Sequence, residues 1–237
     1  MENDFLKILY EDNHVIVVLK PQNVPSQPDS SGDTDMLTYV REYIREKYNK
    51  PGNVYVGLVH RLDRPTGGVM VFAKTSKAAG RLSEQMRTGD FDKRYLAVLM
   101  GKLDPEEGKL ENYLKKNPVN NMVYVCEQGV DGAKYACLEY RTESTEQDLS
   151  LVEIKLHTGR SHQIRVQMAG KSRPVFGDMR YGGERAKKGK LALFAYSLSF
   201  THPVTKERMR FVAEPPVTEA PWSLFDDSAI LRRARGQ

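Results

Sequence analysis

The stretch His60-Arg61-Leu62-Asp63-Arg64-Pro65-Thr66-Gly67-Gly68 leads from a charged loop into the apolar run Val69-Met70-Val71-Phe72-Ala73. An apolar run that follows a glycine pair is typical of a short buried strand. Thr75-Ser76 comes next, and a hydroxyl side chain there can cap a helix, which we expect over residues 77–86. The stretch therefore predicts a charged loop, then a strand, then a helix.

Working outward, the pattern predicts further helices and many strands. Residues 13–19 resemble a buried strand that ends at Lys20-Pro21, and Thr34 or Asp35 can cap a helix over residues 36–48. Ser161 can cap a short helix over residues 163–168 that ends at Gly170. Strand-like segments lie at residues 54–59, 94–100, 109–114, 122–126, 133–140, 149–156, 191–200 and 209–213. Because helices and strands do not alternate regularly, the predicted class is α+β.

The composition is that of a globular protein with a modest positive charge. The 237 residues include 36 Lys+Arg and 31 Asp+Glu, a net charge of +5. The longest apolar run has only five residues and the first residues are acidic, so we expect no membrane span, no secretory signal and a cytoplasmic location. Cys126 and Cys137 flank the hairpin signal Asp131-Gly132, so we expect free thiols opposite each other on paired strands.

Positive charge is concentrated in the last third of the chain. Residues 1–154 carry 20 Lys+Arg and 24 Asp+Glu, whereas residues 155–237 carry 16 and 7. The basic residues are densest in one block, which contains Arg160, Arg165, Lys171, Arg173, Arg180, Arg185, Lys187, Lys188 and Lys190. Such a block indicates a polyanionic partner, nucleic acid first, although a solvated basic face is the alternative on charge alone.

Asp63 is the first candidate for chemistry, because it lies between Arg61 and Arg64. Nearby arginines favour an ionised carboxylate, which can act as a nucleophile at an electrophilic carbon, as in sugar chemistry. Gly67-Gly68 would let a backbone or a ligand approach closely. From these residues alone, a loop with surface ion pairs remains the alternative.

Two other segments combine basic and aromatic side chains. The expected helix at residues 163–168 starts beside Arg160 and His162, and a helix start with arginines can hold a phosphate. No further His or Cys lies at ligand spacing, so we expect no metal. Lys93-Arg94-Tyr95 is suited to stacking a base beneath a phosphate, with a core tyrosine as the alternative.

These segments, together with others in the same order, resemble the RluA-type pseudouridine synthases, which isomerise selected uridines in RNA. The matching blocks are residues 13–25, 60–63 with Thr66 and 72–74, 93–95, 158–165, 176–182 and 198–203. Any one block would be weak support, but six in order make a chance resemblance implausible. The resemblance implies a single catalytic domain over residues 1–237, with a core at about 10–215 and a C-terminal extension at 216–237. It also implies a central mixed, mostly antiparallel sheet flanked by helices and loops, with the active-site cleft across the sheet.

The resemblance implies roles for single residues. Asp63 matches the aspartate that attacks ribose C1′ or otherwise assists cleavage of the glycosidic bond, and Tyr95 matches the tyrosine that stacks on the target base. Arg165 matches the arginine that pairs with the catalytic carboxylate. Arg61 matches the arginine that helps to displace the target nucleotide, and Leu193 falls where the family packs a leucine in the pocket. We also expect Lys93, Arg160 and His162 to bind the substrate.

The implied reaction breaks the bond from N1 to C1′, rotates the uracil and joins C5 to C1′. This rearrangement is redox-neutral, so we expect an isomerase with no cofactor and no metal that acts on ribosomal or transfer RNA as a monomer. The target must leave its stack, and an arginine-rich cleft with a stacking tyrosine could offset that cost. Because the chain starts close to the first block, we expect no separate S4 domain.

Three departures from the family pattern leave these roles in place but weaken any inference about which uridine is modified. Gly67 stands where the family more often has serine, and Gln167 and Phe194 stand where histidine is usual. A carboxylate near an incipient oxocarbenium ion is also used in glycoside hydrolysis. A nucleoside or glycoside hydrolase therefore stays open, as does a catalytically silent RNA-binding or ribosome-assembly factor.

Overall fold

The structure is a computed structural model, and it describes residues 5–183, 186, 189–225 and 230. It contains two compact units, the first formed by Met1–Asp92 with Ala195–Ala213 and the second by Lys93–Phe194 with Glu214–Gln237. Within the described ranges, no helix is long and apolar enough to cross a membrane. The single-domain boundaries predicted above remain a prediction.

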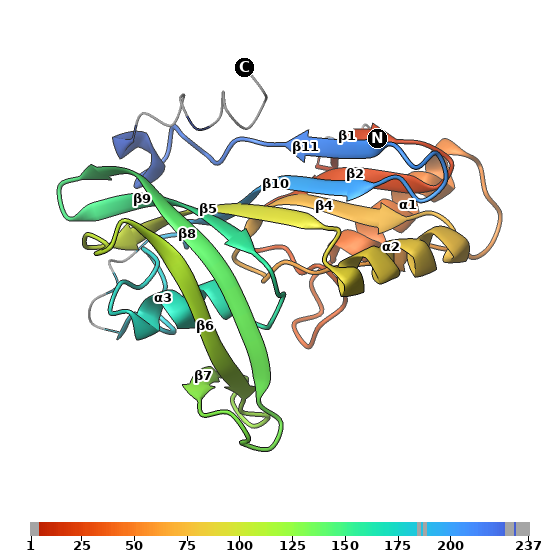
Figure 1. Cartoon of the computed structure of the whole chain (residues 1–237). Helices are drawn as coiled ribbons and strands as arrows, with labels where there is room; N and C mark the ends of the chain where they lie inside the picture. The colour runs from red at the N-terminus through yellow and green to blue at the C-terminus, as the bar shows by residue number, and fades with distance from the viewer. Residues whose placement is uncertain (1–4, 184–185, 187–188, 226–229, 231–237) are drawn as a thin grey trace. The chain divides into compact units, whose positions relative to one another are not determined.

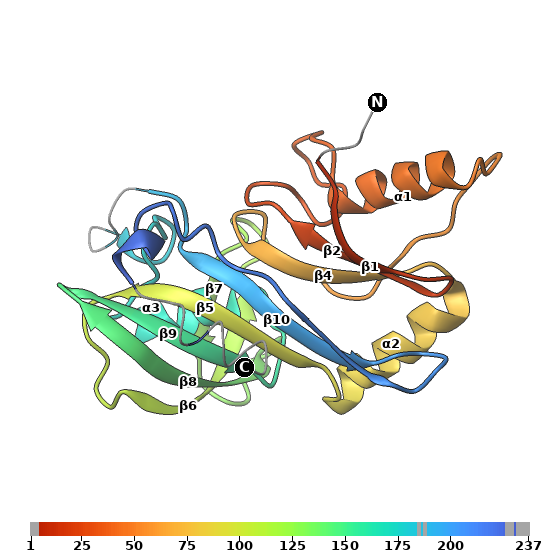
Figure 2. The ribbon, with the colours of Figure 1, turned by 90° about the horizontal axis from the view of Figure 1, so that it is seen from above.

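The first unit is a sheet with a helix on each face (Figures 1 and 2). Its elements are β1 (Lys7–Glu11), β2 (Val15–Lys20), α1 (Met36–Lys47), β3 (Gly57–Leu58), β4 (Gly67–Ala73), α2 (Ser76–Thr88), β10 (Leu193–Thr201, in this unit from Ala195 on) and β11 (Arg208–Val212). The strands lie in the order β1-β2-β4-β10, with β3 paired to β4 and β11 paired to β10.

Alternation along the strands explains why this unit has two helical layers. Val15 and Val17 face Ala78 and Leu82 of α2, whereas Ile16 and the residues that alternate with it point to the opposite face, where α1 lies. Both helices start at the predicted caps. Asp35 accepts a hydrogen bond from the Thr38 amide at 3.2 Å, and Thr75 accepts one from the Ala78 amide at 3.1 Å.

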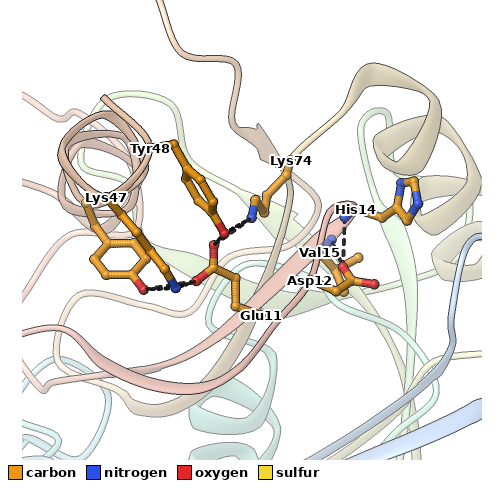
Figure 3. Close-up of polar contacts among 8 residues, drawn as sticks. Glu11, Asp12, His14, Val15, Lys47, Tyr48 and Lys74 are labelled. Atoms are coloured by element: carbon orange, nitrogen blue, oxygen red, sulfur yellow. Dashed lines mark hydrogen bonds and ion pairs between the residues drawn. The ribbon is translucent and has the colours of Figure 1, made fainter. Parts of the chain in front are cut away.

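A polar network fixes the end of β1 to α1 and to the end of β4 (Figure 3). The Glu11 carboxylate accepts hydrogen bonds from Lys47 Nζ at 2.6 Å, from Lys74 Nζ at 2.5 Å and from the hydroxyls of Tyr43 and Tyr48, both at 2.9 Å. Burial acts to raise the pKa of Glu11, but these four donors outweigh it and lower the pKa to about 2. Glu11 is therefore ionised throughout the neutral range.

The second unit is an antiparallel sheet covered on one face by a short helix (Figure 1). Its elements are β5 (Asp92–Met100, in this unit from Lys93 on), β6 (Glu107–Lys116), β7 (Val123–Cys126), β8 (Lys134–Glu146), β9 (Leu149–Leu156), α3 (Gln163–Gly170) and the short 3-10 helix η2 (Trp222–Leu224). The strands lie in the order β5-β9-β8-β6-β7. The buried cluster under α3 combines Leu114, Val123, Ala136 and Val166, with Tyr181 packed against it.

Two local predictions are wrong. β7 pairs with β6 and not with β8, so Cys126 lies opposite Tyr113 while Cys137 lies opposite Glu111. The hairpin turn that joins paired strands here is at residues 117–122, between β6 and β7, where Asn121 takes a left-handed φ of 57°. Residues 131–132 do form a turn, in which the Ala133 amide donates to the Val130 carbonyl at 3.0 Å, but the strands on either side of it each pair with β6. Both cysteines are free, as predicted.

The cap of α3 also differs from the prediction. The N-cap is His162, with a left-handed φ of 52° and no side-chain capping bond, and it is not Ser161. Instead, the side chain of Gln163, the first residue of α3, accepts a hydrogen bond from the Arg160 amide at 3.0 Å.

Candidate active site

The loop that carries Asp63 is held by the segment that follows β2. Ser26 Oγ donates to the Leu62 carbonyl at 2.8 Å and accepts from the Leu62 amide at 3.1 Å. Gln22 Nε2 donates to the Pro65 carbonyl at 3.0 Å. Within the loop, the Thr66 amide donates to the Asp63 carbonyl at 2.9 Å. These bonds fix the backbone on both sides of the half-buried Asp63.

Lys20 provides the deepest support of this loop. Its side chain is fully buried, and Nζ donates to the carbonyls of Pro21 at 2.9 Å, Arg64 at 3.0 Å and Thr66 at 2.8 Å. Burial lowers the pKa of Lys20 to about 7, and the negative charge of Asp63 acts in the opposite direction. Three carbonyl acceptors match the three donors of an ammonium group, so the geometry fits the charged form.

Sequence reasoning missed Lys20, Gln22 and Ser26 as supports of the Asp63 loop. The signal was present, because a lysine that directly ends a run of five apolar residues in a buried strand has no solvent to reach. The sequence did not show the partners, since two of the three acceptors are backbone carbonyls more than forty residues away.

The two arginines that flank Asp63 have different surroundings. Arg64 forms an ion pair with Asp33 and a longer one, at 3.8 Å, with Asp29, so its charge is directed to the loop before α1. Arg61 is exposed. Of the glycine pair, Gly68 is the one that lets another backbone segment, at Ala195, come close. Its φ is +134°, and a Cβ there would lie 2.3 Å from the Ala195 carbonyl oxygen.

In the second unit, β5 presents Lys93 and Tyr95 on one face, since they are two residues apart. Tyr95 is buried, and burial together with the charge of Arg160 lowers the pKa of Lys93. Arg94 points to the other face and pairs with Glu153 at 3.2 Å. Lys93 and Arg160 therefore form a neighbouring pair of cations, and an anion beside them would relieve their repulsion.

Arg165 on α3 is buried against Asp178. Nε donates to Oδ2 and Nη2 donates to Oδ1, both at 2.8 Å, and the guanidinium lies 5.1 Å from the centre of the Tyr181 ring. The amides of Arg180 and Tyr181 also donate to Asp178, at 3.2 and 3.3 Å. The implied pairing of Arg165 with Asp63 joins residues of the two units and remains a prediction.

Tyr181 connects α3 to β7. Its hydroxyl lies 2.6 Å from His162 Nδ1 and accepts from the Val123 amide at 3.1 Å. Neither Asp178 nor Tyr181 was predicted as a site residue, although both lie in the sequence block at residues 176–182, and Asp178 is the one described acid in a strongly basic block. Leu193 is buried at the start of β10, and its role as a pocket leucine remains a prediction.

Among the described residues of the basic block, some are buried or already paired. Arg185, Lys187 and Lys188 lie outside the described residues, and Arg165 is buried in its pair with Asp178. Arg173 donates to the Lys102 carbonyl at 2.6 Å, and Lys190 pairs with Glu219 at 2.7 Å. Arg160 is exposed, and its Nε donates to the Tyr135 carbonyl at 2.8 Å.

Two of the three departures from the family pattern are accommodated as structural residues. Gln167 is buried and donates to the side chain of Asn112 at 2.8 Å, and Phe194 is buried. Within the part of the chain that the structure describes, no group of three or more His, Cys, Asp or Glu side chains could hold a metal ion.

Comparisons with known proteins show the family of this chain. The family described as RNA pseudouridylate synthase matches residues 14–170. A Bacillus subtilis relative named "Uncharacterized RNA pseudouridine synthase YjbO" is 37% identical over 217 residues, which cover 89% of this chain and 73% of the relative. The "Ribosomal large subunit pseudouridine synthase D" of Xanthomonas campestris is 35% identical over 228 residues, covering 90% of this chain and 66% of that protein.

Solved structures show the same fold. Human RNA pseudouridylate synthase domain containing 4 has a TM-score of 0.74 at 23% identity and covers 89% of this chain and 88% of its own. Human RNA pseudouridylate synthase domain containing 1 has a TM-score of 0.74 at 24% identity, covering 98% and 95%. The predicted α+β class and the predicted family are thereby confirmed, and the chain belongs to the RNA pseudouridylate synthase family.

Proposed function

We propose that this protein converts uridine to pseudouridine in RNA, with Asp63, Tyr95 and Arg165 as its catalytic residues. Family membership supports the reaction. The observation that carries the assignment to Asp63 is the set of hydrogen bonds that holds its loop, in which Lys20 and Ser26 bind the backbone on both sides of it. A reacting carboxylate has to be held in one place, and an ordinary surface loop needs no such support.

In the proposed reaction, the Asp63 carboxylate acts at C1′ while the bond from C1′ to N1 breaks. The electron pair of that bond leaves with the uracil, which stays in the site and rotates. C5 then bonds to C1′, and any bond from the carboxylate to C1′ breaks at this step. C5 loses its proton, and N1, which carried none in uridine, gains one, so no oxidant or cofactor is consumed. Tyr95 stacks on the base during the rotation and assists removal of the C5 proton, and Arg165 keeps the carboxylate ionised.

The substrate is ribosomal or transfer RNA, and the name of the Xanthomonas relative favours ribosomal RNA. Lys93, Arg160 and His162 hold RNA phosphates next to the target, Arg61 helps to displace the target nucleotide, and Leu193 lines the pocket. The protein acts as a cytoplasmic monomer and needs no metal. The lowered pKa of Lys93 beside Arg160 supports the phosphate role, since two neighbouring cations favour an anionic ligand.

The test is to replace Asp63 by Asn and to map pseudouridine across total RNA from cells that carry the wild-type gene, the D63N gene or no gene. We expect one or a few uridines to be modified only with the wild type, while purified D63N still binds that RNA. The matched control is D131N, in an exposed turn of the second unit.

Unaltered product with D63N would contradict the assignment of the catalytic residue. Release of free uracil from the RNA would indicate a hydrolase instead. RNA binding without product by the wild type would indicate a silent binding factor.

A further inference from the structure

The part of the sheet formed by β6, β7 and β8 has two different faces (Figure 1). One face packs under α3 through Leu114, Val123 and Ala136. Because side chains alternate along a strand, the residues next to these three point to the opposite face, which we call the outer face. Tyr113, Tyr124 and Tyr135 all belong to the outer face, one from each strand.

The register places the three tyrosines in a row across the sheet. Tyr135 lies directly opposite Tyr113, with ring centres 5.9 Å apart in an edge-to-face arrangement. Tyr113 lies opposite Cys126, so Tyr124, two residues earlier on β7, is its diagonal neighbour on the same face. Tyr124 is 44% exposed and Tyr135 is 39% exposed. Exposed aromatic rings on a sheet are the platform on which bases of single-stranded RNA stack.

Positive charge borders this row. Lys115 lies directly opposite Tyr124 and shares its face. At the other end of the row, Arg160 donates to the Tyr135 carbonyl. Tyr135 lies in the part of β8 that no longer pairs with β9. Glu111, an acid on this face, is already bound by the Tyr135 hydroxyl and by Lys109, the latter at 3.1 Å.

The row is continuous with the cation pair of Arg160 and Lys93, since Arg160 belongs to both. Phosphates that follow these cations would bring successive bases over the rings. A protein partner would use the apolar rings equally well but would not need the two cations at the ends. The combination of rings and cations therefore favours RNA.

We infer that the row of Tyr113, Tyr124 and Tyr135 binds a single-stranded segment of the substrate RNA, with bases stacked on the rings and phosphates on Lys115 and Arg160. The inference rests on the proposed function in so far as it takes the substrate to be RNA. It adds a contact surface that contains none of the three proposed catalytic residues and shares Arg160 with the residues proposed to hold phosphates beside the target.

The experiment measures binding by fluorescence anisotropy with two labelled probes of about 12 nucleotides, a length within the site sizes of stacking surfaces. One probe is oligouridylate and the other is the same backbone without bases. We expect Y124A to bind oligouridylate at least about fivefold more weakly, because one stacked base contributes about 1 to 3 kcal/mol. Its affinity for the abasic probe should stay unchanged, whereas K115A should weaken both probes.

Two matched variants distinguish the loss of base stacking from a general loss of folded structure. Y124F keeps the ring and should bind as the wild type does, and Y55A removes a tyrosine that is 49% exposed in the first unit and should also have no effect. Unchanged oligouridylate affinity in Y124A, or an equal loss for the abasic probe, would overturn the inference. Pseudouridine formation by the wild type is measured separately, so a failure of the proposed function is seen there and not in these variants.

Discussion

Arg165 and Asp178 form a buried ion pair in which two nitrogens of one side chain bond the two oxygens of the other, both at 2.8 Å. They are thirteen positions apart in the sequence, and the guanidinium also lies over the Tyr181 ring. The catalytic arginine of the proposed reaction is therefore positioned by an acid of its own unit. Because Nε and Nη2 are used in this pair, Asp178 fixes the plane and direction of the guanidinium.

Replacing Asp178 by Asn should cost both stability and activity. The variant leaves a buried guanidinium without its counter-charge, a change that costs about 3 to 5 kcal/mol in buried pairs. Urea unfolding measures the loss, and the rate of pseudouridine formation should fall as well. The control is E219Q, which breaks the exposed pair with Lys190 and should cost at most about 1 kcal/mol. If D178N and E219Q lost stability and activity to the same extent, the role of Asp178 in positioning Arg165 would be contradicted.

Replacing Lys20 by Met should slow the reaction more than it weakens RNA binding. The variant keeps the apolar stem but removes the donor that binds three carbonyls, two of which belong to the Asp63 loop. Looser positioning of a reacting group by about 1 Å can cost 100-fold in rate, so we expect kcat to fall by about 10- to 100-fold with little change in KM. K7M, at an exposed lysine of β1, is the control. A selective rise in KM would argue against loop positioning.

The Glu11 network predicts a pH dependence of stability. The folded pKa of Glu11, about 2, lies below its ordinary value of 4.5. Its contribution to the free energy of unfolding is therefore complete above pH 4.5 and is lost as the pH falls toward 2. The contribution is at most about 3 kcal/mol, from 1.36 kcal/mol per pKa unit.

The measurement compares urea unfolding of the wild type and E11Q from pH 7 down to pH 2. The wild type should be more stable at pH 7, and the difference should shrink below pH 4.5. E42Q, at an exposed glutamate of α1, should follow the wild type. A difference that is constant with pH would show that the charge of Glu11 is not what stabilises the network.

Replacing Gly68 by Ala should prevent normal folding of the first unit. The new Cβ would lie 2.3 Å from the Ala195 carbonyl oxygen, and the φ of +134° is strained for any other residue. We expect a loss of at least about 3 kcal/mol, because overpacking costs about 1 to 3 kcal/mol and the strained φ adds about 1 to 3 kcal/mol. The matched change G80A, on α2 with open space around it, should stabilise the helix by up to about 1 kcal/mol. A G68A chain that melts like the wild type would contradict the close packing of β4 on β10.

Some candidate site residues stood out from the sequence alone and others did not. Asp63, Tyr95 and Arg165 stood out because acids, aromatics and arginines at these positions form a pattern along the sequence. Lys20 and Asp178 did not, because what each one does depends on a partner that folding brings to it. The carbonyls that Lys20 binds carry no sequence signal, and Asp178 looked like a lone acid in a basic block.

What the sequence by itself determined is the local order of this protein: a helix cap at Thr34 or Asp35, a second cap at Thr75-Ser76, the buried strands, and the family to which the chain belongs. These follow from side-chain chemistry and spacing over a few residues. Only the tertiary structure decided that β7 pairs with β6, that Arg165 is held by Asp178 and that the Asp63 loop is supported by Lys20. Such choices depend on which distant groups can be satisfied together when polar atoms leave water, and no local pattern records that competition.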